Sequence, residues 1–266
     1  MERTTMINEK ALEERARALR CAERMYVYYA DLEQQHSVFC APAGGPGVLR
    51  ASELRTRVFW KLPLYRQSHE FTSGLACVQS VLRFAGYAFD TREDRLIKKL
   101  ASGPVEGISG QAIAEFIRMA HLQQAPGKKP LEAGPIGAKL CERLYDLYNT
   151  DAAAQLAQAL NAGPVICRVQ ARRPDRQYAP AVNENGHYVV AVGYSKGCFA
   201  EVEEALNYRF YFMDPSTAGS YTYLDAPDLL CRWHDKIDGK SKQLSVAVTY
   251  ACRTPAAPID LIYELS

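Results

Sequence analysis

The chain changes character at Asn161, and this change limits the folds that it can adopt. Before that residue, apolar side chains recur mainly at helical spacing, and after it four short runs are rich in β-branched and aromatic residues. These runs are residues 163–171, 187–194, 208–215 and 244–250. β-Branched and aromatic side chains favour strands. Because helices come first and strands second, the sequence predicts an α+β fold with an antiparallel sheet.

The part of the chain before Asn161 predicts mainly helices. Apolar residues recur every three or four positions, with charged residues between them. The predicted helices cover residues 8–35, 73–86, 91–100, 108–122 and, in two pieces divided near Asn149, 136–160. Residues 57–67 are apolar and aromatic and are predicted to be extended. We therefore expect N-terminal helices to pack on the antiparallel sheet.

A break in this pattern divides the chain into two parts. Residues 41–50, APAGGPGVLR, are rich in glycine and proline, which interrupt helices and strands. We predict that residues 1–50 form an N-terminal helix followed by a linker. Residues 51–266 are then predicted to form one domain, a size that is ordinary for a single hydrophobic core.

Charge and hydropathy exclude several classes of partner. The 266 residues carry a net charge of only +2, so neither nucleic acid nor an anionic membrane is expected as the main partner. The N-terminus has no apolar signal-peptide core, and no apolar run approaches the roughly 18 residues of a membrane span. We expect a cytoplasmic protein, or one delivered by a route without a cleaved signal peptide. The sequence does not define the oligomeric state.

The eight cysteines are scattered, with no CxxC pair and no spacing typical of zinc ligands. A chain of this length does not need disulfides to fold, so the sequence predicts reduced and mostly buried thiols. We expect no metal and no cofactor.

Ser73 lies at the start of a strongly apolar helix, a position with two interpretations. Serine is a favoured helix cap, and capping alone accounts for it. The helix N-terminus is also where the dipole favours an anionic nucleophile. The second interpretation gains weight only if a base and its orienting acceptor are found elsewhere in the chain.

His187 and Asp214 are candidates for that base and acceptor. His187 follows a glycine at the mouth of an apolar strand, and Asp214 ends another strand. If the two strands form a hairpin that pairs Tyr194 with Asn207, His187 falls directly opposite Asp214. Side chains opposed in an antiparallel pair lie close enough to interact. The spacing is thus consistent with a hydrogen-bonded His–Asp pair.

These residues together resemble a known family, the papain-like leader peptidases at the N-terminus of bacteriocin exporters and their free-standing relatives. The matching motifs are Gln67, Thr72-Ser73-Gly74, Gly86 at the helix end, Gly186-His187 before an apolar strand, and Asp214-Pro215. The resemblance covers about residues 62–235 and not the N-terminal helix. It implies a papain-like fold for the domain at residues 51–266 and a peptide or protein substrate.

The resemblance also implies a role for each residue. Ser73 occupies the nucleophile position, His187 is the base, and Asp214 orients its ring. Gln67, six residues before Ser73, donates its side-chain amide to the oxyanion. The family has cysteine where this chain has Ser73, and a hydroxyl is much harder to ionise than a thiol. We expect this form to be inactive, either through an engineered Cys→Ser change, which the retained histidine and aspartate favour, or as a natural pseudo-enzyme.

Other candidate residues have structural interpretations. Cys77 lies one helical turn after Ser73 and is predicted to be a packed thiol rather than the nucleophile. Residues 232–235, Arg-Trp-His-Asp, are expected to close the edge of the domain.

Three functions remain open. The first is a cysteine-peptidase-like hydrolase of a peptide or isopeptide bond, which a Cys/His/Asp triad would catalyse. The second is a deamidase or acyl transferase that uses the same triad, since each reaction passes through an acyl-enzyme. The third is a catalytically silent module that binds peptides.

Overall fold

A computed structural model describes residues 54–87, 93–100, 107–120, 136–146, 149–170, 186–197, 204–216 and 221–250. The predicted N-terminal helix and the linker before residue 51 lie outside these residues. Among the described residues, no helix is both long and apolar enough to cross a membrane.

The fold is centred on one antiparallel sheet. Its strands run in the order β2-β8-β3-β4-β5-β6, while β1 pairs with β4 and β7 pairs with β8. The strands are β1 (Leu54–Phe59), β2 (Ile136–Leu144), β3 (Val165–Gln170), β4 (Gly186–Gly197), β5 (Tyr208–Met213), β6 (Tyr221–Asp225), β7 (Asp235–Ile237) and β8 (Lys240–Tyr250). Since every described pair is antiparallel, the predicted α+β class is confirmed.

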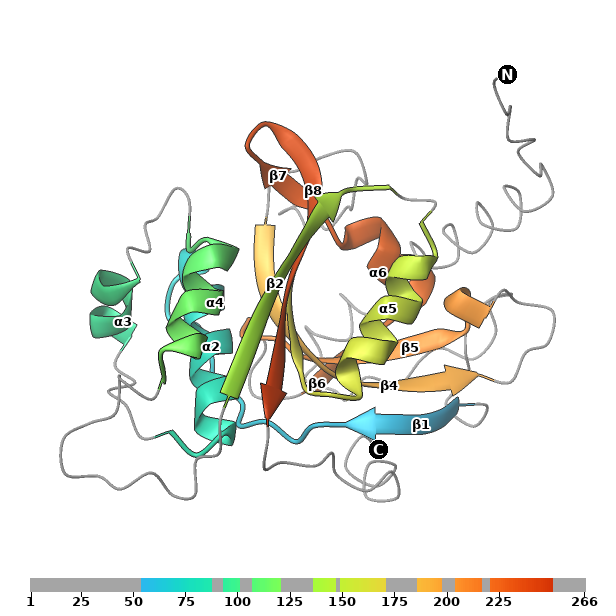
Figure 1. Cartoon of the computed structure of the whole chain (residues 1–266), viewed down its shortest axis with the longest axis horizontal. Helices are drawn as coiled ribbons and strands as arrows, with labels where there is room; N and C mark the ends of the chain where they lie inside the picture. Colours follow the sequence, from blue (N-terminus) through green and yellow to red (C-terminus); the bar gives the residue numbers. More distant parts are fainter. Residues whose placement is uncertain are drawn as a thin grey trace, which may run out of the picture.

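Helices cover the sheet on both sides (Figure 1). They are α2 (Ser73–Phe84), α3 (Glu93–Lys99), α4 (Gly110–Arg118), α5 (Asp151–Leu160) and α6 (Ala226–Arg232), with short 3-10 turns η2 (Glu70–Thr72) and η4 (Glu204–Leu206). In Figure 1, α2, α3 and α4 lie on one side and α5 and α6 on the other. Of the helices that precede most of the sheet in the chain, α2 and α4 pack against it, as predicted, and α3 packs on α2.

Alternation along β4 explains the two layers. Val190 and Val192 belong to the core beneath α2 and α4, whereas Val189 and Ala191 belong to the core beneath α5 and α6. Successive side chains of a strand point to opposite faces, so a continuous apolar run is what a strand covered on both faces requires. β4 is consequently covered on both faces near the predicted site.

Glycine lets α2 approach the sheet closely. A Cβ atom on Gly74 would lie 2.3 Å from Cγ2 of Ile108 and 3.1 Å from the ring of Tyr188. At the other end, Gly86 has a φ of +85°, a conformation that ends the helix and that glycine adopts without strain. The predicted limits of this helix are therefore correct to within two residues.

The prediction of helix for the first part of residues 136–160 is wrong. Ile136–Leu144 forms β2, which pairs with β8 along all nine of its residues, while the second part, Asp151–Leu160, is the helix α5. Composition favours helix in IGAKLCERL because Ala, Lys, Leu, Glu and Arg are good helix formers. Pairing with β8 overrides this local preference.

Candidate active site

Ser73 is the first residue of α2, and the turn before it is fixed by its neighbours. The Thr72 hydroxyl donates to the His69 carbonyl (2.8 Å), and the His69 N–H donates to the Thr72 hydroxyl oxygen (3.1 Å). Ser73 is 4% exposed. The serine side chain thus lies at a buried helix N-terminus, where the helix dipole favours negative charge.

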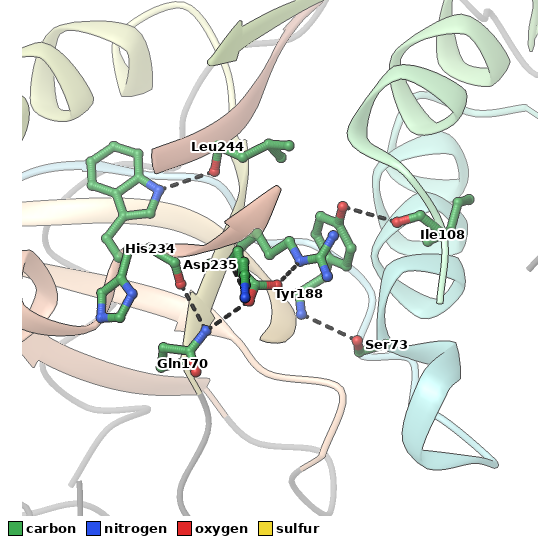
Figure 2. Close-up of polar contacts among 10 residues, drawn as sticks. Ser73, Ile108, Gln170, Tyr188, His234, Asp235 and Leu244 are labelled. Atoms are coloured by element: carbon green, nitrogen blue, oxygen red, sulfur yellow. Dashed lines mark hydrogen bonds and ion pairs between the residues drawn. The ribbon is translucent and has the colours of Figure 1, made fainter. Parts of the chain in front are cut away.

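The side chain of Ser73 contacts the strand that bears His187. The backbone N–H of Tyr188 donates to the Ser73 hydroxyl oxygen over 3.1 Å (Figure 2). The last paired residues of β4 and β5 are Val190 and Met213, so Gly186–Val189 extend past the end of β5. The unfinished edge of β4 therefore accommodates the first turn of α2 in place of another strand.

His187 and Asp214 are in contact. His187 Nε2 and Asp214 Oδ1 are 2.7 Å apart, and His187 is 8% exposed. The backbone N–H of Ser216 (2.9 Å) and the Ser216 hydroxyl (2.8 Å) also donate to Oδ1. Because Nε2 is engaged by the carboxylate, Nδ1 is the ring nitrogen through which His187 would exchange a proton with another group.

The charge state of Asp214 follows from opposing effects. Burial raises the pKa of its carboxyl. The charge and hydrogen bond of His187 and the two hydrogen bonds from Ser216 lower the pKa by more than burial raises it, and the net value is about 2. Asp214 is therefore a carboxylate at neutral pH and accepts a proton from His187 Nε2 in a hydrogen bond. This selects the ring tautomer that leaves Nδ1 as a proton acceptor.

The predicted strand register is wrong, although the His–Asp contact is present. Tyr194 lies opposite Phe210 rather than Asn207, an offset of three residues. A bulge between Ala191 and Gly193 then reduces the offset to two, so that Val190 lies opposite Met213. If this register is continued, Asp214 faces Val189, two residues from His187 on the same face. A slip of two residues preserves the face of a strand, whereas a slip of one or three reverses it.

Gln67 lies beside the Asp214-Pro215 turn. Its backbone N–H donates to the Pro215 carbonyl over 3.0 Å, and the residue is half-buried. This bond brings the segment before α2 to the end of β5. The oxyanion role of the Gln67 side chain stays a prediction.

One contact of a working triad is absent from the described residues. No hydrogen bond joins the Ser73 hydroxyl to the His187 ring there, and the two residues are linked instead through the backbone of Tyr188. The Ser73 hydroxyl thus contacts the backbone of Tyr188, the residue that follows His187 in β4, and not the His187 ring.

Cys77 is unsuited to be the nucleophile. It is fully buried, and burial, followed by the charges of Asp214 and Cys167, raises its pKa well above the ordinary value. A thiol in such a place is inert because only the thiolate attacks. Within the described residues, no group of three or more His, Cys, Asp or Glu side chains could hold a metal ion.

Sequence reasoning missed two partners of the site. Ser216 follows Asp214-Pro215, and an aspartate side chain commonly accepts from the backbone N–H two residues on, so this contact was predictable from turn chemistry. The backbone N–H of Tyr188 was not, since every residue except proline has one. Residues 232–235 are also more buried than an edge requires, with Trp233 and His234 at 3% and 1% exposed.

Comparison with known proteins gives structural similarity at a distance, without a match in sequence. No family model matches the chain, and no curated protein matches it. Among solved structures, it is similar to a double glycine motif protease from an AMS/PCAT transporter, crystallised in complex with the leader peptide. The sequences are 15% identical, the TM-score is 0.40, and the match covers 74% of this chain and 98% of the other.

Proposed function

We propose that this chain is the serine form of a cysteine-peptidase-like hydrolase that acts on a peptide or isopeptide bond. The observation that supports this most is the junction of α2 with β4: Ser73 begins the helix and contacts the residue after His187, whose ring is paired with Asp214 at 2.7 Å. A buried helix N-terminus, an imidazole and a carboxylate are the groups that nucleophilic acyl transfer uses.

With a thiol at position 73, the chemistry would proceed through an acyl-enzyme. Nδ1 of His187 takes the thiol proton, and the sulfur attacks the substrate carbonyl carbon. The oxyanion accepts hydrogen bonds from the backbone N–H of residue 73 and from the Gln67 amide. His187 returns the proton to the leaving amine as the C–N bond breaks. Water then cleaves the thioester, releases the acid and restores the thiol.

The surroundings of residue 73 suit a thiolate better than an alkoxide. The helix dipole and the Tyr188 N–H both stabilise an anion at that position and lower the pKa of a thiol there. The much weaker acidity of a hydroxyl needs a base in direct hydrogen-bond contact, and the described Ser73 hydroxyl has Tyr188 N–H as its partner instead. We therefore expect the Ser73 form to be inactive.

Selective alkylation of the Ser73→Cys form tests the proposal. Iodoacetamide at about pH 6 should label residue 73 rapidly, while the other cysteines react slowly. The matched control is His187→Ala in the same background, which should slow labelling of residue 73. If Cys77 in the original chain is the first residue to react, the nucleophile is misassigned by one helical turn.

A second candidate is binding without cleavage by the chain as it stands. Ser73 itself favours it, because its hydroxyl is hydrogen-bonded to the Tyr188 N–H and not to a base. A silent module should bind the same peptides whether residue 73 is serine or cysteine, and the Ser73→Cys form should then release no product. Failure of the Ser73 form to bind a peptide that the Ser73→Cys form cleaves would exclude this candidate.

A further inference from the structure

A largely buried ion pair lies beneath the strand end that bears His187. Arg168 of β3 pairs through Nε with Oδ2 of Asp235, the first residue of β7. The two side chains are 20% and 5% exposed. Asp235 Oδ1 accepts from the Gln170 side-chain amide (3.1 Å) and from the Lys236 backbone N–H (2.8 Å), so the carboxylate is held on both oxygens (Figure 2).

The pair contacts both residues that flank His187. A Cβ atom on Gly186 would lie 2.0 Å from Oδ2 of Asp235 and 3.0 Å from Nε of Arg168. On the other side, the Arg168 guanidinium carbon lies 5.4 Å from the centre of the Tyr188 ring, a distance typical of a cation–π contact. The ion pair thus fits against the β4 backbone immediately before and after His187.

Strand register accounts for this arrangement. Arg168 lies opposite Tyr188 and Gln170 lies opposite Gly186, whereas His187 lies opposite Val169. Directly opposed residues share a face, so Arg168, Gln170 and Tyr188 point to one face and His187 occupies the alternate position. The ion pair therefore acts on His187 only through the backbone and through its two neighbours.

Tyr188 makes three contacts, which reach the ion pair, Ile108 and the first residue of α2. Its ring packs against Arg168, its hydroxyl donates to the Ile108 carbonyl (3.0 Å), and its backbone N–H donates to the Ser73 hydroxyl (3.1 Å). Figure 2 shows Tyr188 between Asp235 on one side and Ser73 and Ile108 on the other. A displacement of the ring would move the N–H that contacts residue 73.

We propose that the Arg168–Asp235 pair is a positioning device that fixes Tyr188, and through the Tyr188 N–H sets the place of the residue 73 side chain next to His187. A buried ion pair often adds little stability over apolar side chains of similar size, and its planar geometry is better suited to fixing direction. The functional consequence rests on the proposed function, while the positioning itself does not.

Amide hydrogen exchange in the chain as it stands tests the positioning directly. Ser73→Ala removes the acceptor and should speed exchange at the Tyr188 amide about tenfold relative to the Val190 amide on the same strand, which reports general stability. Arg168→Met should give a similar relative increase. Arg168→Lys, which keeps the charge, should restore most of the protection.

The chain offers a matched control in a second buried pair. Arg209 pairs with Asp225 (2.7 Å), and its guanidinium lies 4.1 Å from the centre of the Tyr223 ring, yet Arg209 faces Ser195 at the opposite end of β4. Arg209→Met should leave the ratio of Tyr188 to Val190 exchange unchanged. If Arg168→Met does not fold, the double variant Arg168→Met with Asp235→Leu removes both charges together and should show the same relative increase.

The outcomes separate this proposal from the proposed function. An unchanged exchange ratio in a folded Arg168 variant overturns the positioning role. In the Ser73→Cys background, Arg168→Met should also slow iodoacetamide labelling of residue 73 at about pH 6 by about tenfold, since a lost hydrogen bond raises a thiol pKa by about one unit. If the exchange ratio responds but residue 73 of Ser73→Cys never labels selectively, the positioning stands and the proposed function fails.

Discussion

The two ends of β4 differ in what borders them. At the far end, residues 193–197 lie between β1 and β5, and the Ser195 hydroxyl bonds the Tyr211 hydroxyl over 2.6 Å. At the near end, β5 stops at Met213, and the backbone meets the first turn of α2 instead. A completed ladder uses its N–H groups for pairing, whereas an unfinished one presents them to side chains. The candidate site therefore lies where the sheet is incomplete.

The largest loss of activity is expected when the proposed base at the near end of β4 is removed. In the Ser73→Cys form, we expect His187→Ala to lower the rate of peptide cleavage by about 100- to 10,000-fold, the usual contribution of a general base. Ser195→Ala at the far end should change that rate less than about twofold, because Ser195 lies far along β4 from the reacting atoms and distant sites act independently. Single-turnover cleavage of one peptide by both variants measures the difference. Equal losses at the two ends would remove the distinction between them.

Gln67 should show the next largest effect. In the Ser73→Cys form, Gln67→Ala is expected to reduce turnover by about 100- to 1,000-fold, the value typical of one oxyanion donor. The Gln67 backbone bond to Pro215 is retained in this variant, so the fold should be unaffected. Steady-state rates together with a thermal melt separate the two effects. An unchanged turnover number excludes Gln67 from the site.

Two glycines on β4 allow the ends to be compared by the same substitution. A Cβ on Gly193 would lie 2.3 Å from the Val58 carbonyl oxygen, a backbone atom, whereas a Cβ on Gly186 would meet the Asp235 side chain at 2.0 Å. Both changes should destabilise the protein by about 1–3 kcal/mol, with Gly193→Ala the larger because backbone yields less. Only Gly186→Ala should also slow labelling of residue 73 in Ser73→Cys. Urea unfolding and alkylation rates measure the two effects.

Acid should destabilise the protein more through the near end of β4 than through the far end. The folded pKa of Asp214 is about 2 against an ordinary 3.8, so its stabilising contribution is complete above pH 4 and is lost as the pH falls toward 2. We expect the chain to lose about 2 kcal/mol over this interval, and Asp214→Asn to lose much less. Glu204, paired with Lys196 at the exposed far end, should give no measurable difference when changed to Gln. Urea titrations between pH 5 and pH 2 test the contrast.

The sequence was sufficient to predict the elements that bear the site. Ser73 at a helix start, His187 at a strand mouth and Asp214 at a strand end were all predicted from local pattern, because apolar runs and their polar ends reflect burial directly. The contact of His187 with Asp214 was also expected, although for a register that is wrong. The contact was still predicted correctly because the register error near the site is two residues, which leaves both side chains on the same face.

What the sequence did not reveal depends on pairing between distant segments. The strand β2 has helical composition and becomes a strand only because β8 is beside it. The Arg168–Asp235 pair joins residues 67 positions apart, and nothing in the local pattern of either distinguishes it from a solvated charge. The bulge between Ala191 and Gly193 likewise depends on the fit of β4 to β5, and the glycine beside it does not by itself define the register.

That bulge determines which face of the sheet the residues on either side of it point to. On its site side, His187 and Asp214 share a face only because the extra residue shifts the alternation by one, and deletion of a single residue there would send the imidazole and the carboxylate to opposite faces. Removal of two residues would keep both side chains on the same face and would only shorten the strand. Insertions or deletions of two residues in this strand should therefore preserve the faces of His187 and Asp214, whereas those of one residue should not.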